Sequence, residues 1–263
     1  MKRFCCALAA LLLATHVDAK PLDHGDLVTF TTRDGVTQRI FIESPSPSPA
    51  WVIVLFGGAQ GALHLDTTGA TTLRGNFLIR SAHHWIDWGD AVVLVDTPSD
   101  HAQGVDDLFR RSKQSFIDTQ AVTAKLRERF PTAKIALVGT SAGTVSVGNA
   151  LERDPGIAAA FVLTSPVTVA HRGGATISGL DVDGTQHRVL VVSNLHDQCV
   201  ASPAYAGKRL AEGNHYAFIE VDSTEGEASS KCGGRSPHGF LGIETNVLHD
   251  IQAWLDGQPI QMQ

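Results

Sequence analysis

A short segment near the middle of the chain constrains the fold most. Residues 139–143 read Gly-Thr-Ser-Ala-Gly, a G-x-S-x-G pattern centred on Ser141. The apolar run 135–138 before it is typical of a buried strand, and residues 144–153 after it have helical character. Strand, tight turn and helix in this order predict a nucleophile elbow, which exposes a serine oxygen at the carboxyl end of a sheet. The alternative is an ordinary glycine-rich turn between a strand and a helix.

The first 19 residues have the pattern of a signal peptide. Two basic residues precede the apolar stretch 4–14, and residues 17–19 end in small-x-small order, as at a signal peptidase site. The apolar stretch is short for a membrane span. The alternative is a buried N-terminal helix. We therefore expect export to the periplasm or secretion, and a single domain over residues 20–263 without a membrane span.

Composition limits the classes of partner. The chain has 263 residues, of which 43% are hydrophobic and 18% charged, an ordinary globular balance for one large domain. The net charge is −6 and no block of basic residues occurs, so nucleic acid is not an expected partner. The 12 histidines do not by themselves indicate a metal.

Two cysteines remain after the signal peptide is removed, Cys199 and Cys232. In an oxidising compartment they form one possible disulfide. Two free thiols are the first alternative. A metal site is the second, although neither cysteine belongs to a C-x-x-C motif or to a Cys/His cluster.

Strand and helix patterns alternate along the chain. Residues Asp34 and Gly35 separate two alternating runs and predict a β-hairpin. The expected strands are 27–33, 36–43, 51–56, 91–95, 134–138, 157–164, 188–193 and 216–221. The expected helices are 74–88, 115–130, 144–153, 202–213 (with Ser202 as N-cap) and 241–255, while 97–112 is polar and loop-like. This order predicts an α/β fold with a mostly parallel sheet and helices on both faces.

Three side chains with complementary chemistry follow strand ends. Ser141 follows one strand, Asp197 the strand at 188–193, and His238 lies in the loop after 216–221. Ligands bind beyond the carboxyl ends of strands in such sheets, so these groups converge. A serine needs a base to accept its proton, histidine titrates near neutral pH, and a carboxylate orients the histidine. We interpret Ser141, Asp197 and His238 as a catalytic triad.

Each partner has a competitor. Asp222 follows the next strand and could replace Asp197, which is otherwise a solvated loop acid. His249 could replace His238, but it falls within the expected terminal helix, away from the strand ends. A disulfide between the two cysteines would join the acid loop to the base loop.

An oxyanion would need two backbone N–H donors. We expect the N–H of Ala142, directly after the nucleophile, and one from the turn 57–60, with Ala59 or its neighbour favoured. The competing interpretation of 57–61 as a dinucleotide loop lacks the G-x-G-x-x-G spacing. No cofactor and no metal are expected.

The chain resembles the α/β-hydrolases, over nearly all of its length after the signal peptide. The resemblance rests on residues 139–143, the Gly57-Gly58 turn, 196–199 and 236–239. It is similar to small exported bacterial members, and this implies an eight-stranded fold and a Ser-His-Asp hydrolase. The chain departs from lipases in having no obvious lid, and its oxyanion turn lacks the His-Gly-Gly-Gly form.

The resemblance and the residues together predict a serine hydrolase that acts on a small-molecule acyl substrate through an acyl-enzyme, with a carboxylic ester as the default. Amide or peptide, thioester and lactone hydrolysis use the same triad. A non-catalytic binding protein on a hydrolase fold is the alternative of another class.

Overall fold

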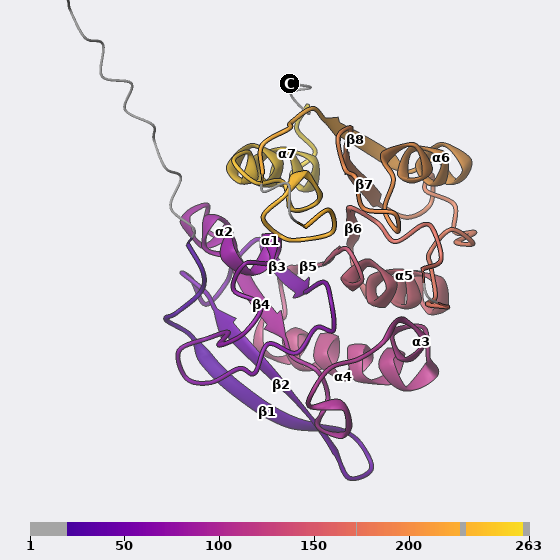
Figure 1. Cartoon of the computed structure of the whole chain (residues 1–263). Helices are drawn as coiled ribbons and strands as arrows, with labels where there is room; N and C mark the ends of the chain where they lie inside the picture. The colour runs from indigo at the N-terminus through magenta and orange to yellow at the C-terminus, as the bar shows by residue number, and fades with distance from the viewer. Residues whose placement is uncertain (1–19, 172, 227–229, 260–263) are drawn as a thin grey trace, which may run out of the picture.

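A single eight-stranded sheet is the central element of the computed structural model, which describes residues 20–171, 173–226 and 230–259 (Figure 1). The expected signal peptide lies outside the described residues. The strand order is β1-β2-β4-β3-β5-β6-β7-β8. The strands are β1 (Asp26–Arg33), β2 (Val36–Glu43), β3 (Trp51–Phe56), β4 (Ala91–Val95), β5 (Lys134–Thr140), β6 (Ala160–Thr164), β7 (Val189–Asn194) and β8 (Ala217–Val221). The predicted fold class is confirmed.

Most of the sheet is parallel. The β1–β2 and β2–β4 pairs are antiparallel, and every other neighbouring pair is parallel. At the predicted hairpin turn, Gly35 has a φ of 68°, which glycine adopts without a steric penalty. Because β3 and β5 to β8 run in one direction, their carboxyl ends lie along one edge of the sheet, where ligands bind in such folds.

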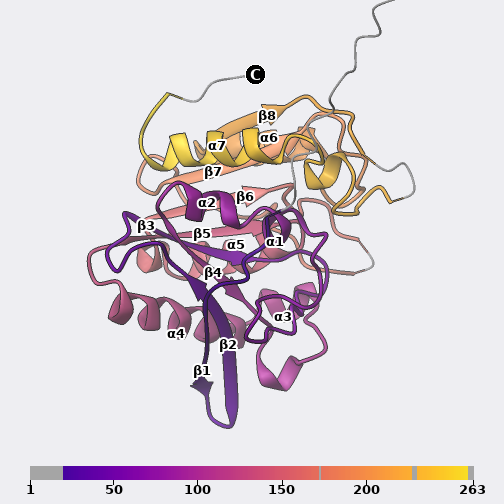
Figure 2. The same ribbon diagram turned by 90° about the vertical axis from the view of Figure 1, so that its left-hand side faces the viewer.

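Helices cover both faces of the sheet. They are α1 (Phe77–Arg80), α2 (His83–Asp87), α3 (Asp107–Arg110), α4 (Lys113–Arg129), α5 (Gly143–Arg153), α6 (Ala204–Asn214) and α7 (Glu244–Leu255), with the 3-10 turns η1 (Ser99–His101), η2 (Pro155–Ile157) and η3 (Pro237–Gly239). Figure 2 shows α2 and α7 in front of the sheet and α4 and α5 behind it. Within the described residues, no helix combines the length and apolarity needed to cross a membrane.

Each face of the sheet has its own hydrophobic core. Side chains alternate between the two faces along a strand. In β3, Ile53 and Leu55 therefore pack with α1, α2 and α7, while Val52 and Val54 pack with α4 and α5. A strand buried on both faces is apolar at every position, which explains the unbroken apolar run of β3.

Two of the expected helices differ most from the structure. The segment 74–88 forms α1 and α2 instead of one helix, because the backbone at Ser81 (φ −113°, ψ 5°) leaves the helical region. The last helix begins at 244 instead of 241. Phe240 (φ 55°) and Gly242 (φ 80°) lie in the left-handed region, which a right-handed helix cannot include.

Two further details differ from expectation. Pro203, with an extended ψ of 135°, is the N-cap of α6, and Ser202 lies one residue outside it. The polar segment 97–112 is partly helical, since it contains η1 and α3. The side chain of Asp106 caps α3 by accepting the N–H of Phe109 at 2.7 Å.

Asp90 is a buried acid at the start of β4, with 3% of its surface exposed. Burial raises the pKa of its carboxyl to about 6, and the nearby Asp256 carboxylate adds to the rise. Its Oδ1 accepts the backbone N–H of Trp51 at 3.1 Å. The folded protein therefore binds this proton more tightly than the unfolded chain. The protonated Asp90 carboxyl therefore contributes fully to the free energy of unfolding below the unfolded pKa of about 4. This contribution is lost as the pH rises through about 6.

We predict that Asp90→Asn raises the free energy of unfolding at pH 8 by about 2 kcal/mol, because the amide keeps the acceptor for Trp51 and removes a buried charge. At pH 3.5 the effect should be close to zero. Urea unfolding at both pH values measures this. Asp34→Asn, in the exposed hairpin turn, is the control and should change stability little at either pH. An equal effect of Asp90→Asn at both pH values would contradict the explanation.

Candidate active site

Ser141 lies at a sharp turn between β5 and α5. Its φ of 52° is in the left-handed region, which is unusual for a residue with a side chain. Its N–H donates to the carbonyl of Thr164 at 3.0 Å, and its carbonyl accepts the N–H of Thr144 at 2.9 Å. Ser141 is half-buried. The backbone on both sides of the serine is therefore fixed, while the residue keeps access to solvent.

Close packing explains the two glycines of the motif. A Cβ added to Gly139 would lie 2.6 Å from the carbonyl oxygen of Gly143, and one added to Gly143 would lie 2.1 Å from that of Phe56. Neither position has room for a side chain. Gly58, in the turn after β3, is also close, since its added Cβ would lie 3.1 Å from Cβ of Ser141. The turn after β3 therefore lies against the serine.

His238 and Asp197 form a buried hydrogen bond. Nδ1 of His238 and Oδ2 of Asp197 are 2.8 Å apart, and the two side chains are 3% and 1% exposed. The other carboxylate oxygen accepts the N–H of Cys199 at 2.8 Å. Because the carboxylate accepts from Nδ1–H, the neutral ring carries its lone pair on Nε2. The ring is oriented as a base for a group on its Nε2 side.

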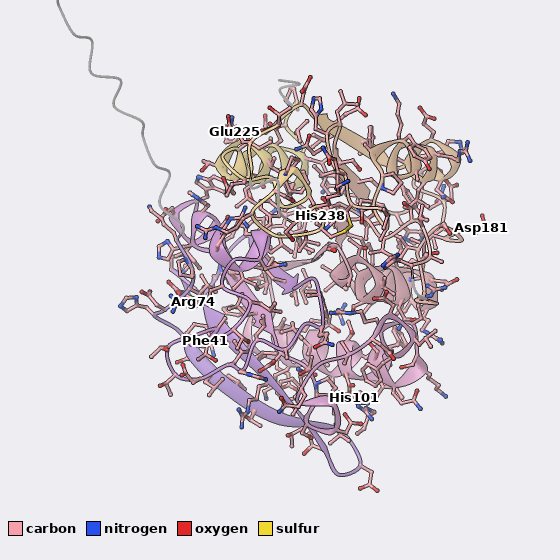
Figure 3. The ribbon with its side chains drawn as sticks, in the orientation of Figure 1. Phe41, Arg74, His101, Asp181, Glu225 and His238 are labelled. Carbon is pink, nitrogen blue, oxygen red and sulfur yellow. A yellow bond between two sulfur atoms is a disulfide. The ribbon has the colours of Figure 1, made fainter. Side chains whose placement is uncertain are left out.

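His238 and Ser141 line the same cavity. The cavity has a volume of about 270 Å³, and both Ser141 and His238 line it together with Gly58 and Ala59. Nε2 is buried, and no group in the described part of the chain hydrogen-bonds to it. Figure 3 places His238 near the middle of the molecule. The structure thus brings Ser141 and the Asp197–His238 pair to one cavity, without a serine–histidine hydrogen bond.

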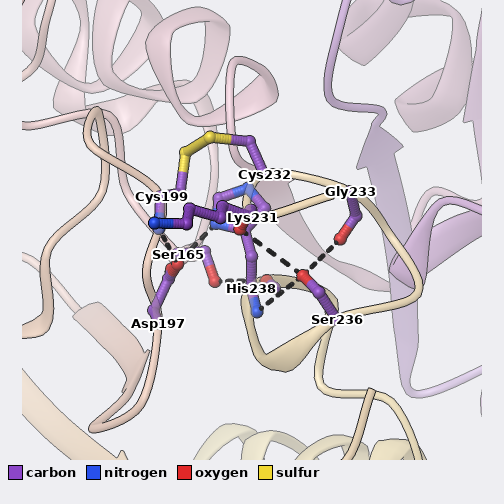
Figure 4. Close-up of a disulfide and its surroundings, with 8 residues drawn as sticks. All are labelled: Ser165, Asp197, Cys199, Lys231, Cys232, Gly233, Ser236 and His238. Carbon is purple, nitrogen blue, oxygen red and sulfur yellow. Dashed lines mark hydrogen bonds and ion pairs between the residues drawn. A yellow bond between two sulfur atoms is a disulfide. The ribbon is translucent and has the colours of Figure 1, made fainter. Parts of the chain in front are cut away.

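The histidine loop is held on several sides. Ser165 donates its hydroxyl to the carbonyl of His238 at 2.7 Å (Figure 4). Asn194, fully buried at the end of β7, donates to the carbonyls of Ser223 (3.0 Å) and Pro237 (3.1 Å). The amide of Asn194 therefore ties the end of β7 to the loop that carries His238.

Arg80 holds the opposite side of this loop. It donates to the carbonyl of Gly239 at 2.6 Å and forms an ion pair with Glu244 at 2.8 Å. Burial lowers the pKa of Arg80, and the bonds to Glu244 counter this. The ion pair attaches α1 to the start of α7, so the histidine loop is clamped between them.

The two competing residues lie elsewhere. Asp222 is an exposed acid bonded to Nε2 of His196 at 2.8 Å. His249 lies in α7 and packs edge-on against Trp88, with ring centroids 6.1 Å apart. Neither residue lines the cavity that contains Ser141.

Free backbone donors occur directly after the serine and in the turn after β3. In the described residues, the N–H groups of Gly58, Ala59, Gln60 and Ala142 have no hydrogen-bond acceptor. Ala59 has a φ of 50°, so the turn that contains it is strained like the serine turn. These donors include both groups expected to form the oxyanion hole, Ala59 and Ala142, and the two neighbours of Ala59 remain equally available.

Cys199 and Cys232 form a disulfide, with Cα atoms 4.6 Å apart (Figure 4). The predicted pairing is therefore present, and the alternatives of free thiols and a metal site are excluded for these two cysteines. The bond joins the loop of Asp197 to the loop of His238, two residues after the acid and six before the base.

Asn76 is a site residue without a role in the sequence interpretation. It is the N-cap of α1, but its side chain makes no capping bond. It lines the cavity, and its Nδ2 lies 3.1 Å from the Cβ position of Gly58. Asparagine at the start of a helix is normally interpreted as a cap, so the sequence carried no signal of this second position.

The competing interpretation of residues 57–61 is not supported by their geometry. The turn at 57–61 does not open a helix, because the next helix begins at Phe77, so it lacks the geometry of a dinucleotide loop. Among the described residues, no group of three or more His, Cys, Asp or Glu side chains could hold a metal ion.

Known proteins resemble this chain in three-dimensional structure, but none was found by comparing sequences. No family model and no curated protein matches the sequence. Among solved structures, XC6422 from Xanthomonas campestris, described as an α/β serine hydrolase without a lid, is 17% identical with a TM-score of 0.60, over 91% of this chain and 100% of that one. Esterase 2 of Thermogutta terrifontis is 16% identical with a TM-score of 0.59, over 90% and 97%. The chain has the α/β-hydrolase fold.

Peptidases share this fold over part of their length. Dipeptidyl peptidase 4 of Porphyromonas gingivalis is 12% identical with a TM-score of 0.55, and the match covers 87% of this chain but 36% of the peptidase. Sequence identities of 12–17% support a shared fold and do not establish a shared activity. The chemistry of this chain must be argued from its own side chains.

Proposed function

We propose that the protein is a serine hydrolase that cleaves a small carboxylic ester through an acyl-enzyme. The observation that carries the proposal is the buried His238–Asp197 pair, 2.8 Å apart, whose ring has an unbonded Nε2 and lines the same cavity as Ser141. Ser141 itself lies on a strained turn beside free backbone donors. A nucleophile, an oriented base and oxyanion donors are the parts that acyl transfer requires.

The proposed reaction has two steps. Nε2 of His238 accepts the proton of Ser141 as Oγ attacks the ester carbonyl, and the carbonyl oxygen becomes an oxyanion facing the N–H of Ala142 and of the turn after β3. The imidazolium, stabilised by Asp197, then protonates the alcohol as it leaves. Water attacks the acyl-enzyme by the same proton path and releases the acid. Ser141 and Nε2 would approach each other when substrate binds, as catalytic hydrogen bonds often do.

The relatives in structure favour an esterase over a peptidase. The match spans 100% of the lidless serine hydrolase and 97% of the esterase, but 36% of the peptidase. The connection between β6 and β7 contains no helix in its described residues, 165–171 and 173–188. Without a covering lid, we expect a small, water-soluble acyl substrate. Amide, thioester and lactone hydrolysis remain alternatives on the same residues, and so does ligand binding without chemistry.

We also propose that the protein is exported to the periplasm or secreted. The pattern of residues 1–19 supports this, and so does the Cys199–Cys232 disulfide, because structural disulfides persist in oxidising compartments.

A fluorophosphonate probe tests the function. We predict that the wild-type protein is labelled once, that Ser141→Ala abolishes labelling, and that this variant loses about 10⁴-fold or more of its kcat on p-nitrophenyl esters, since the nucleophile is gone. Ser178→Ala, at an exposed position, is the matched control and should behave as wild type. Comparing p-nitrophenyl esters of graded chain length with peptide substrates then separates an esterase from a peptidase. Folded wild-type protein that does not react would favour the binding protein instead.

The disulfide should matter for activity before it matters for folding. We predict that the Cys199→Ser/Cys232→Ser double variant stays folded at 25 °C but loses about 10-fold in kcat/KM, because the acid and base loops are no longer held in register. Its free energy of unfolding should fall by about 3–4 kcal/mol, from a loop closed over a sequence separation of 33 residues. Circular dichroism and ester hydrolysis measure both effects. Unchanged activity in the folded double variant would refute the role in register.

A further inference from the structure

Arg110 is a buried cation whose place in the structure needs explanation. It ends α3 and is 3% exposed. Burial lowers the pKa of its guanidinium to about 10, although Asp107 and Asp106 counter this at longer range, so it remains charged at neutral pH. No carboxylate of the described residues forms an ion pair with it. Burying a charge without a counter-ion costs desolvation free energy. Hydrogen bonds from the guanidinium to neutral acceptors must offset this cost.

Two of these acceptors belong to the oxyanion turn. Nη2 of Arg110 donates to the carbonyl of Gly57 at 3.3 Å and to that of Ala59 at 3.1 Å. The guanidinium also lies against Gly61, whose φ is 73°, since a Cβ there would be 2.6 Å from Nη2. The turn after β3 therefore packs closely on this cation.

Peptide geometry connects these bonds to the free donors. In a planar trans peptide the N–H points opposite to the C=O. The carbonyls of Gly57 and Ala59 point to Arg110, so the N–H groups of Gly58 and Gln60 point away from it, and these are two of the unbonded donors of the turn. The intervening carbonyl of Gly58 accepts the N–H of Gly61 at 3.1 Å, which closes the turn. A cation on a carbonyl oxygen also withdraws electrons from the peptide and strengthens its N–H as a donor.

The third acceptor lies on the nucleophile helix. Nη1 of Arg110 donates to Oγ of Ser146 at 3.0 Å. Ser146 belongs to the first turns of α5, and the N-cap of this helix is Ala142. The same guanidinium thus touches both structures that carry the candidate oxyanion donors, the turn after β3 and the helix after Ser141.

We propose that Arg110 is a positioning residue for the oxyanion hole. It fixes the turn 57–60 relative to the start of α5 and polarises the peptides that carry the free N–H groups of Gly58 and Gln60. This inference rests on the proposed hydrolase function. It predicts an effect on the tetrahedral state, where negative charge develops, and little effect on the binding of uncharged substrate.

The test combines ester kinetics with a short-chain alkyl trifluoromethyl ketone. Oγ of Ser141 adds to the ketone carbonyl, the π electron pair moves to oxygen, and the serine proton passes to Nε2 of His238. Arg110→Met should lower kcat by about 10- to 100-fold with a nearly unchanged KM. The affinity of the enzyme for the ketone should fall by a similar factor. By ¹⁹F NMR, the hemiketal hydroxyl of the adduct should titrate about one pH unit higher or more than in wild type, a change that a loss of stability alone does not produce.

Arg111→Met is the matched control. Arg111 is the next residue, pairs with Glu152 at 2.6 Å and should leave kcat and the hemiketal titration as in wild type. If Arg110→Met does not fold, Ser146→Ala, which removes one acceptor, should lower kcat by about 2- to 10-fold in the same direction. A folded Arg110→Met variant, or in its absence Ser146→Ala, with wild-type kcat and titration would overturn this inference alone. A wild-type protein that forms no adduct and hydrolyses no ester would overturn the proposed function and this inference with it.

Discussion

The carbonyl oxygen of Phe56, at the end of β3, faces the first residue of α5 so closely that a Cβ on Gly143 would lie 2.1 Å from it. This contact presses the helix after the serine against the strand next to β5 in the sheet. Ser141 is then forced into a turn with a positive φ, and the turn after β3 is brought against its Cβ. The position of Ser141 next to the turn after β3 is therefore explained by one backbone packing constraint.

A second constraint places His238. The ring of His238 is buried, bonded to Asp197, and carried on a loop that is tied to β7 by Asn194, to β6 by Ser165 and to the acid loop by the disulfide. Loops are usually the mobile parts of a fold. Here side-chain, backbone and covalent bonds join the loop of Asp197 to the loop of His238, which is the pre-organisation that the proposed function requires.

Much of this arrangement could be predicted from local sequence. Strands buried on both faces are apolar throughout, so β3 and β4 were predicted with their observed limits and β5 with an end two residues too early. The glycine spacing around Ser141 indicated a tight turn. The strand-end rule pointed to Asp197 and His238 without any knowledge of distances, because parallel strands bring their carboxyl ends to one edge. Two cysteines after an expected signal peptide were sufficient to suggest the bond between Cys199 and Cys232.

Other features depend on contacts between residues far apart in sequence. Arg110 lies in a polar segment that looks like a loop, and its acceptors Gly57 and Ala59 are about 50 residues earlier in the chain. Asn76 occupies a capping position without capping, and Asn194 is the last residue of a strand. Each has an ordinary local explanation, so only the folded arrangement distinguishes its role from that of a cap or a strand end.

The central claim is that Ser141, His238 and the donors around them form one acyl-transfer site, and a crystal structure of the protein after reaction with an alkyl fluorophosphonate tests it most directly. We expect phosphorus bonded to Oγ of Ser141, one phosphoryl oxygen about 3 Å from the N–H of Ala142 and from an N–H of the turn 57–60, and Nε2 of His238 facing the phosphonate. Phosphorus on another residue, or a phosphoryl oxygen directed away from these N–H groups, would contradict the account.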